Sequence, residues 1–126
     1  MQAKKYDLKQ LTFIATTTAT NFGLVTAGAE GVPPNMKRYV VYANYYNPSA
    51  YAFVTLWERI GTTDRIMDKF GLTQYQERNK PTGGVPDPEK PVYVFRASSY
   101  IRCQTSAPLG GTGNVEVTMQ VYDEPG

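Results

Sequence analysis

Apolar residues recur at every second position in several stretches of the chain, which is the spacing of a β-strand with one buried face. In the clearest example, residues 115–122, one alternating set is Val115, Val117, Met119 and Val121, and the other is Glu116, Thr118, Gln120 and Tyr122. This alternation predicts a strand that buries its valines and its methionine. The other set, with Tyr122, is expected on the face exposed to water.

Other segments are apolar on both faces. Residues 39–46 and 51–57 are rich in β-branched and aromatic side chains, and Asn47 and Pro48 lie between them. The pair predicts an antiparallel hairpin in the middle of a sheet or at a subunit contact, because a strand without a polar face is buried on both sides. Residues 92–103 predict a further, continuous strand.

Residues 63–70 have a different spacing. Ile66, Met67 and Phe70 would lie on one face of a helix, a preceding threonine suits the helix start, and Gly71 suits the residue just past its end. This pattern predicts one short helix that has to be held by packing, because it spans only about two turns.

The remaining segments complete the domain organisation. Residues 73–91 are polar and rich in Pro and Gly, and they predict a loop long enough to be functional. Residues 1–10 are polar and predict an N-terminal arm, followed by a single domain over residues 11–126. Short strands separated by Gly/Pro-rich turns predict an all-β, mainly antiparallel fold. We expect a β-sandwich or jelly-roll-like domain with one short inserted helix near 63–70.

Charge and hydropathy argue against two kinds of partner. The net charge is +2, from 13 basic and 11 acidic residues, and the chain lacks the basic cluster that neutralises phosphates, so we expect no nucleic-acid partner. No apolar stretch approaches the length of a membrane span, so we expect no membrane partner. The segment after Lys4 and Lys5 turns into a run of threonines, which does not fit a signal peptide.

The chain has no histidine and one cysteine, Cys103. Without histidine, Ser-His-Asp and Cys-His machinery and most zinc sites are excluded. Cys103 lies in a strand-like run and is expected to be a small core residue. A chain without disulfides suits a reducing compartment such as the cytoplasm. We therefore expect no enzymatic activity, no cofactor and no metal.

Carboxylates are the remaining candidates for chemistry. Asp64 and Asp68 would share a face of the predicted helix, which can indicate a cation. Arg65 and Lys69 lie on the adjacent stripe, so a solvated charged face explains the pattern as well. A hydrolase that uses Glu58 or Asp64 would require two acids that converge in a pocket, and no spacing in the chain predicts this.

Tyrosine is the more informative residue, because the chain has ten of them and several crowd the segment 39–57. Rings on a sheet face stack on sugars or anchor a protein partner, while core packing and cross-strand pairs account for part of the set. The large aromatics outnumber what one face of a small core holds, so some are expected to contact another molecule. The residues expected to bind a partner are Lys4, Lys5, Tyr6, Tyr42, Tyr46, Tyr51 and Tyr75.

The layout of the chain resembles that of small β-sandwich virion proteins, in particular the decoration (cement) proteins of tailed-virus-like capsids. The resemblance rests on the polar arm, a Thr-rich first strand, the segment from Met36 through Trp57, the long loop and the closing strand from Gly113 to Met119. It covers most of the chain. It implies a homo-oligomer, typically a trimer, whose arm or loop contacts the major capsid protein in the virion. The inserted helix with its long loop departs from this layout.

Two functions of different classes are therefore expected. The first is a non-enzymatic structural protein that assembles through aromatic sheet faces and binds a larger lattice with its arm and the 73–91 loop. Many shallow contacts repeated by symmetry would supply the avidity. The alternative is a carbohydrate- or peptide-binding module that uses exposed rings among Tyr42, Tyr46, Tyr51 and Tyr75.

Overall fold

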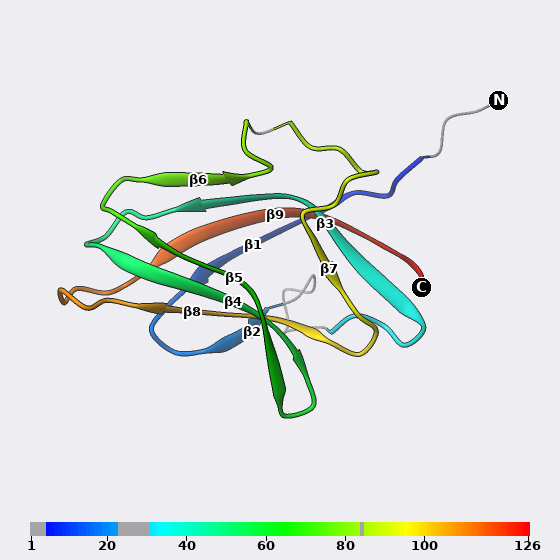
Figure 1. Ribbon diagram of the computed structural model, residues 1–126, viewed down its shortest axis with the longest axis horizontal. Helices are drawn as coiled ribbons and strands as arrows, with labels where there is room; N and C mark the ends of the chain where they lie inside the picture. Colours follow the sequence, from blue (N-terminus) through cyan, green and yellow to red (C-terminus); the bar gives the residue numbers. More distant parts are fainter. Residues whose placement is uncertain (1–4, 23–30, 84) are drawn as a thin grey trace.

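The computed structural model describes residues 5–22, 31–83 and 85–126, which form nine β-strands and no helix (Figure 1). The strands are β1 (Lys9–Ala15), β2 (Thr20–Phe22), β3 (Met36–Tyr46), β4 (Ala52–Ile60), β5 (Thr63–Leu72), β6 (Glu77–Lys80), β7 (Tyr93–Phe95), β8 (Tyr100–Ser106) and β9 (Val115–Pro125). The predicted all-β class is confirmed. Nothing helical among the described residues is long and apolar enough to cross a membrane.

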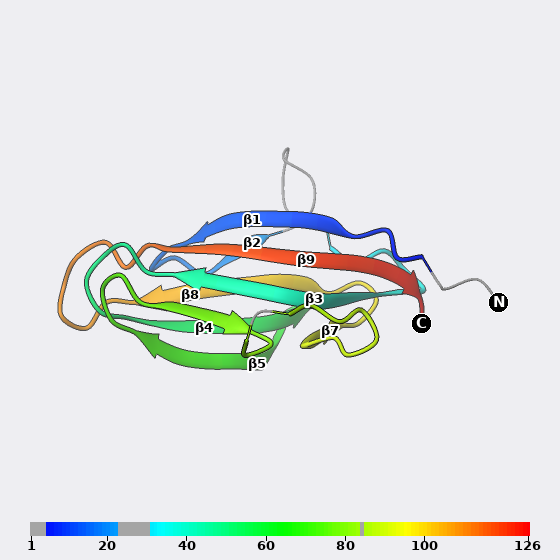
Figure 2. The same cartoon turned by 90° about the horizontal axis from the view of Figure 1, so that it is seen from above.

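The strands form two antiparallel sheets that pack face to face (Figure 2). Sheet A has the order β1-β9-β3-β6, with β7 also pairing with β3, and sheet B has the order β2-β8-β4-β5. The predicted β-sandwich is therefore correct.

The strand pairs show how the chain is wound. β1 pairs with β9, β2 with β8, β3 with β6 and β7, and β4 with β5, as in one long hairpin that turns between β4 and β5. Wrapping this hairpin on itself adds the pairs β3 with β9 and β4 with β8. This is the strand order of a jelly roll, counting β6 and β7 as one interrupted strand.

The core lies between the sheets and is built by the alternation predicted for the last strand. Val115, Val117, Met119 and Val121 of β9 are all buried there. Cys103 of β8 is also a core residue, as predicted, and burial raises the pKa of its thiol to about 12. A thiol with this pKa is inert at neutral pH, since the thiolate is the reactive form.

The predicted helix near 63–70 is wrong, because these residues form β5, which pairs with β4 along its length. The register shifts within the pair: Ile66 lies opposite Trp57 and Asp68 opposite Leu56, so Met67 is the extra residue of a β-bulge. The bulge shifts the phase of the alternation. Phe70 faces the core, Met67 is the half-buried bulge residue and Ile66 is 60% exposed on the outer face, so the three apolar residues imitate the spacing of a helix face without sharing one face of the strand.

The predicted hairpin of residues 39–46 with 51–57 is also wrong. β3 belongs to sheet A and β4 to sheet B, so residues 47–51 carry the chain across the sandwich. Alternation reports which faces of a strand are buried and leaves the neighbouring strand unspecified.

Asn47 fixes this crossing. Its side chain is fully buried, and its Nδ2 donates to the carbonyl oxygens of Leu72 (2.9 Å) and Ala50 (3.1 Å). Its backbone N–H donates to Gln76 O (3.0 Å), and its carbonyl accepts from the Tyr75 N–H (2.6 Å). Asn47 thus ties the β3–β4 connection to the β5–β6 turn.

The bounds of three further predicted segments require correction. The predicted loop 73–91 contains β6, which pairs with β3 at the edge of sheet A. The predicted strand 92–103 is divided into β7 of sheet A and β8 of sheet B, and the chain crosses between the sheets at residues 96–99. Strand β1 begins at Lys9, inside the segment expected as an arm.

Candidate binding face

The outer face of sheet A carries a row of tyrosines. In β3 the fully buried Val40, Ala43 and Tyr45 are interleaved with half-buried residues that point away from the core. The outward residues of β3 lie opposite residues of β9 in the pairs Tyr39–Tyr122, Tyr42–Gln120, Asn44–Thr118 and Tyr46–Glu116. We call this surface the tyrosine face and define it by Tyr6, Tyr39, Tyr42, Tyr46 and Tyr122.

A β-bulge in β3 brings two of these rings onto the same face. The register with β9 shifts between Val40 and Tyr42, so Val41 is the extra residue. Simple alternation places Tyr39 on the face opposite Tyr42, because the two are three positions apart. The bulge removes this difference, and Tyr39 joins the outer face.

One end of the tyrosine face is a cluster of rings. Tyr122 stacks on Tyr39, with ring centroids 5.0 Å apart and an interplanar angle of 16°, and Tyr6 packs on Tyr122 at 4.8 Å and 56°. The Tyr122 hydroxyl donates to the carbonyl oxygen of Pro88 (2.8 Å). Tyr122 was expected on the water-exposed face. Its ring does lie on the outer face, but these neighbours cover it, and it is only 6% exposed.

The other end combines one ring with amides. The Tyr42 hydroxyl donates to Asn79 Oδ1 (3.0 Å), and Asn44 Nδ2 donates to the same oxygen (2.7 Å) and to Glu77 Oε1 (2.6 Å). These bonds link β3 to β6 and hold the polar groups in one arrangement. A surface that is already ordered loses less side-chain entropy on binding.

The structure brings together some of the predicted partner-binding residues and separates others. Tyr6, Tyr42 and Tyr46 share the tyrosine face. Tyr51 lies against sheet B, where its ring meets Phe53 edge-on at 5.3 Å. Tyr75 is 68% exposed in the β5–β6 turn. Lys5 is exposed, and Lys4 lies outside the described residues.

Sequence reasoning missed several members of this surface. Asn79 was expected in a loop, and only its pairing opposite Asn44 places it on the sheet. Tyr39 depends on a bulge for which the sequence carries no signal. Tyr122 was assigned to the correct face, but its burial depends on Tyr6, which lies far from it in the sequence.

Glu58 is a structural carboxylate. Its side chain is fully buried at the end of β4, where Oε1 accepts from Arg65 Nε (3.1 Å) and Arg96 Nε (2.9 Å), and Oε2 accepts from the Arg96 backbone N–H (2.7 Å). Burial alone raises the pKa of Glu58, but the hydrogen bonds from Arg96 and the charges of both arginines outweigh it. The pKa therefore lies below its ordinary value.

The remaining acidic candidates are separated. Asp64 pairs with Arg59 (3.1 Å) on sheet B. Asp68 accepts from the Tyr93 hydroxyl (2.6 Å) and pairs with Lys80 (3.3 Å). Over residues 5–22, 31–83 and 85–126, no group of three or more Cys, Asp or Glu side chains is arranged to hold a metal ion. Glu58, Asp64 and Asp68 thus each belong to a different ion-pair network.

Comparison of the chain with protein-family models, with curated proteins and with solved structures finds no match.

Proposed function

We propose that the chain is a non-enzymatic assembly protein of the capsid-decoration type. It binds a larger protein lattice through one surface made of the N-terminal arm, the loop after β6 and the tyrosine face. The lattice is formed by a major capsid protein, and the chain itself forms a homo-oligomer, for which the resemblance favours a trimer. The jelly roll is compatible with this role, but capsid and lectin domains both use it. The surface of the chain, rather than its fold, therefore distinguishes the two functions.

The observation that carries the proposal is the position of Tyr122. Its ring packs on Tyr6 of the arm and on Tyr39 of β3, and its hydroxyl binds the Pro88 carbonyl of the loop. The segments expected to bind the lattice are thereby joined into one continuous surface.

The chemistry of this surface supports a protein partner. Tyrosine offers a large, rigid contact area with a polar tip, and it is enriched in protein interfaces and in antibody combining sites. Tyr39, Tyr42 and Tyr46 lie on the side of β3 away from the core, which Val40, Ala43 and Tyr45 fill. A contact with another molecule would explain why these three large rings lie on the outer face of sheet A.

The test begins with the genes beside the coding sequence, where a major capsid gene is expected. Shells assembled from that capsid protein are then sedimented with the chain. We expect the wild-type chain to pellet with the shells and the Tyr42→Ser/Tyr46→Ser variant to stay in the supernatant. The matched control is Phe53→Ser on sheet B, which should pellet as wild type does. A wild-type chain that stays in the supernatant contradicts the proposal.

The oligomer is tested separately by light scattering over a range of protein concentrations. A trimer is expected from the resemblance, and symmetric repetition of shallow contacts would supply the avidity. A chain that remains monomeric at high concentration contradicts this part of the proposal.

The alternative is a carbohydrate-binding module, and the network around Tyr42 favours it specifically. A ring beside the Asn44 and Asn79 amides and the Glu77 carboxylate combines a stacking surface with hydrogen-bonding groups. This alternative predicts a hit on a glycan array that Tyr42→Ala abolishes, and a monomer satisfies it. An array without a hit on the wild-type chain eliminates it.

A further inference from the structure

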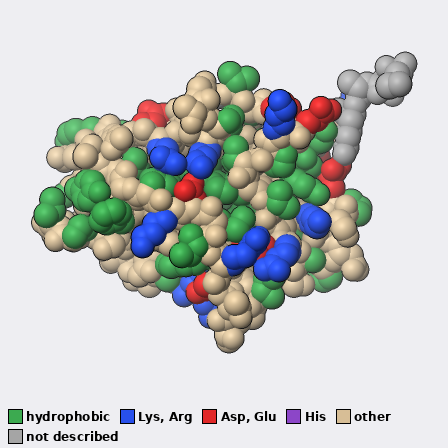
Figure 3. Space-filling view, viewed as in Figure 1, with side chains coloured by type: hydrophobic (Ala, Val, Ile, Leu, Met, Phe, Trp, Pro, Cys, Tyr) green, Lys and Arg blue, Asp and Glu red, His purple; other side chains and the backbone are tan. Residues whose placement is uncertain are grey.

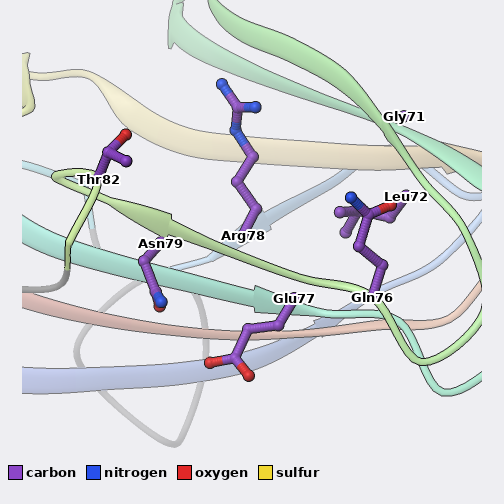
Figure 4. Close-up of a pocket in the computed structure, with 7 residues that line it drawn as sticks. All are labelled: Gly71, Leu72, Gln76, Glu77, Arg78, Asn79 and Thr82. Carbon is purple, nitrogen blue, oxygen red and sulfur yellow. The ribbon is translucent and has the colours of Figure 1, made fainter.

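A pocket of about 260 Å³ lies at the open edge of the sandwich, where β6 of sheet A runs beside the end of β5 of sheet B (Figure 4). Its lining residues are Gly71, Leu72, Gln76, Glu77, Arg78, Asn79 and Thr82. It borders one end of the tyrosine face, because Asn79 and Glu77, which bind Tyr42 and Asn44 there, also line the pocket.

Arg78 is the residue that gives this pocket its chemistry. It projects from β6 to the side opposite Glu77 and Asn79 (Figure 4). Its guanidinium carbon lies 4.5 Å from the centre of the Phe70 ring, a cation–π distance. Its Nε is buried and has no hydrogen-bond partner among the described residues. Phe70 therefore positions the guanidinium without neutralising it.

Two charged residues line the pocket: Arg78, and Glu77, which projects to the opposite side of β6 (Figure 4). Lys80, the next inward-facing residue of β6, pairs with Asp68 at 3.3 Å. Glu77 is bound to Asn44 on the outer side of the sheet. Among the described residues Arg78 has no carboxylate partner. Figure 3 shows Lys and Arg side chains (blue) interspersed with Asp and Glu side chains (red) across this edge of the molecule.

Thr82 supplies a second donor. Its side chain projects to the same side of the β6 segment as Arg78 (Figure 4), and its hydroxyl makes no hydrogen bond to a described residue. Leu72 adds an apolar wall to the pocket. The Arg78 guanidinium and the Thr82 hydroxyl can both donate to a carboxylate, and Leu72 can pack against a short carbon chain. This combination suits a small organic carboxylate.

We propose that this pocket is a binding site for a small organic carboxylate, held by the Arg78 guanidinium and the Thr82 hydroxyl. The volume of about 260 Å³ fits a ligand of a few heavy atoms, since drug-sized ligands occupy larger pockets. The proposal does not rest on the assembly function, because Arg78 and Thr82, which would hold the ligand, make no contact with the rings of the tyrosine face and project to the opposite side of β6 from Asn79.

The test is a titration of the ¹⁵N-labelled chain with sodium succinate, with sodium chloride balancing the ionic strength. Saturable shifts are expected for the backbone amides of Leu72, Gln76 and Thr82. Arg78→Gln should weaken succinate binding about tenfold or more, because a charge-assisted hydrogen bond is lost. The matched control is Arg102→Gln, whose guanidinium is bound to Asn21 on sheet B, and it should bind succinate as wild type does.

If Arg78→Gln fails to fold, a second variant, Thr82→Val, still tests whether the pocket binds succinate. Thr82→Val removes one donor from an exposed position and should weaken binding about threefold. Amides that do not shift saturably, or shifts that persist unchanged in the folded Arg78→Gln and Thr82→Val variants, overturn the site. Inorganic phosphate that binds more tightly than succinate overturns the assignment to a carboxylate.

Discussion

At the scale of single residues, two buried polar side chains connect parts of the chain that are distant in sequence. Glu58 joins β4 to β5 and to the β7–β8 crossing through Arg65 and Arg96. Asn47 joins the β3–β4 connection to the β5–β6 turn. A buried polar group without its partners is costly, so each of these residues fixes the path of the backbone around it.

Replacing Glu58 with glutamine is expected to lower the free energy of unfolding by about 2 kcal/mol, because the buried acceptor loses its charge beside two arginines. Urea denaturation monitored by tryptophan fluorescence measures this. Glu116→Gln, on the exposed outer side of β9, serves as the control and should change stability little.

The same variant predicts a pH dependence. The pKa of Glu58 in the folded chain lies below its ordinary value, so the unfolded chain binds the proton more readily. The stabilisation by Glu58 is complete above the unfolded-state pKa and is lost as pH falls through the folded-state pKa. The stability difference between wild type and Glu58→Gln should therefore shrink in acid. A difference that is constant with pH would show that the charge of Glu58 has no part in it.

Asn47→Ala removes the donor to Leu72 O and leaves a buried carbonyl without its partner. We expect a loss of about 2 kcal/mol in the free energy of unfolding. Ser49→Ala is the comparison: it deletes a hydroxyl that donates to Asn47 Oδ1 (2.9 Å) and leaves the Nδ2 bonds intact. Equal losses in the two variants would contradict the role assigned to the amide nitrogen.

At the scale of elements, the β4–β5 hairpin shows what a turn and a bulge each contribute. Ile60 pairs with Thr63, and Gly61 between them has φ of 59°. Glycine at the first position of a tight hairpin turn is the II′ pattern, whose twist matches that of the strands. The turn sets the register at one end, and the bulge at Met67 resets it in the middle of the strand.

Gly61→Ala should lower the free energy of unfolding by about 1 kcal/mol, since alanine is strained at a positive φ. No other atom lies within 4 Å of an added Cβ, so this cost is conformational rather than steric. Thr62→Ala in the same turn should have a small effect. Thermal unfolding of the two variants distinguishes backbone strain from a general sensitivity of the turn.

Comparison of individual strands shows which parts of the fold can be predicted from the sequence. The strand at 115–122 was predicted because one face is buried and the other exposed along its whole length. Residues 63–70 were misread because a bulge shifts the alternation, and the hairpin of 39–46 with 51–57 because burial does not specify the neighbouring strand. For the candidate site, the sequence predicted Tyr6, Tyr42 and Tyr46. It missed Tyr39 and Asn79, which depend on a bulge and on a long-range pairing.

At the scale of the whole molecule, the jelly roll brings the arm, the closing strand and the loop after β6 to one surface. β1 pairs with β9, so the arm that precedes β1 lies beside the end of β9, where Tyr122 is located. β7 pairs with the start of β3, which places the loop before it near the same end. The Tyr122 side chain contacts both segments: its ring packs on Tyr6 of the arm, and its hydroxyl donates to Pro88 of the loop.

Tyr122→Phe keeps the ring stack and removes the hydrogen bond to Pro88. The backbone amides of Glu89 and Lys90, which donate to Asp87, should exchange with deuterium about fivefold faster, because the loop loses an attachment worth ~1 kcal/mol. Tyr39→Phe is the matched control, since the Tyr39 hydroxyl makes no hydrogen bond to a described residue. Unchanged exchange in Tyr122→Phe would show that the loop is held by other contacts.

The burial of Cys103 has a practical consequence. Its thiol has a pKa of about 12 and no exposed area, so maleimides and Ellman's reagent should leave the folded protein unmodified and react only after denaturation. A cysteine introduced at Thr62, which is exposed in the β4–β5 turn and outside the tyrosine face, would then be the sole position that accepts a dye. The wild-type chain, which should take up no dye, serves as the control for labelling. Binding of the labelled chain to a labelled capsid shell could then be followed by fluorescence energy transfer, without replacing Cys103.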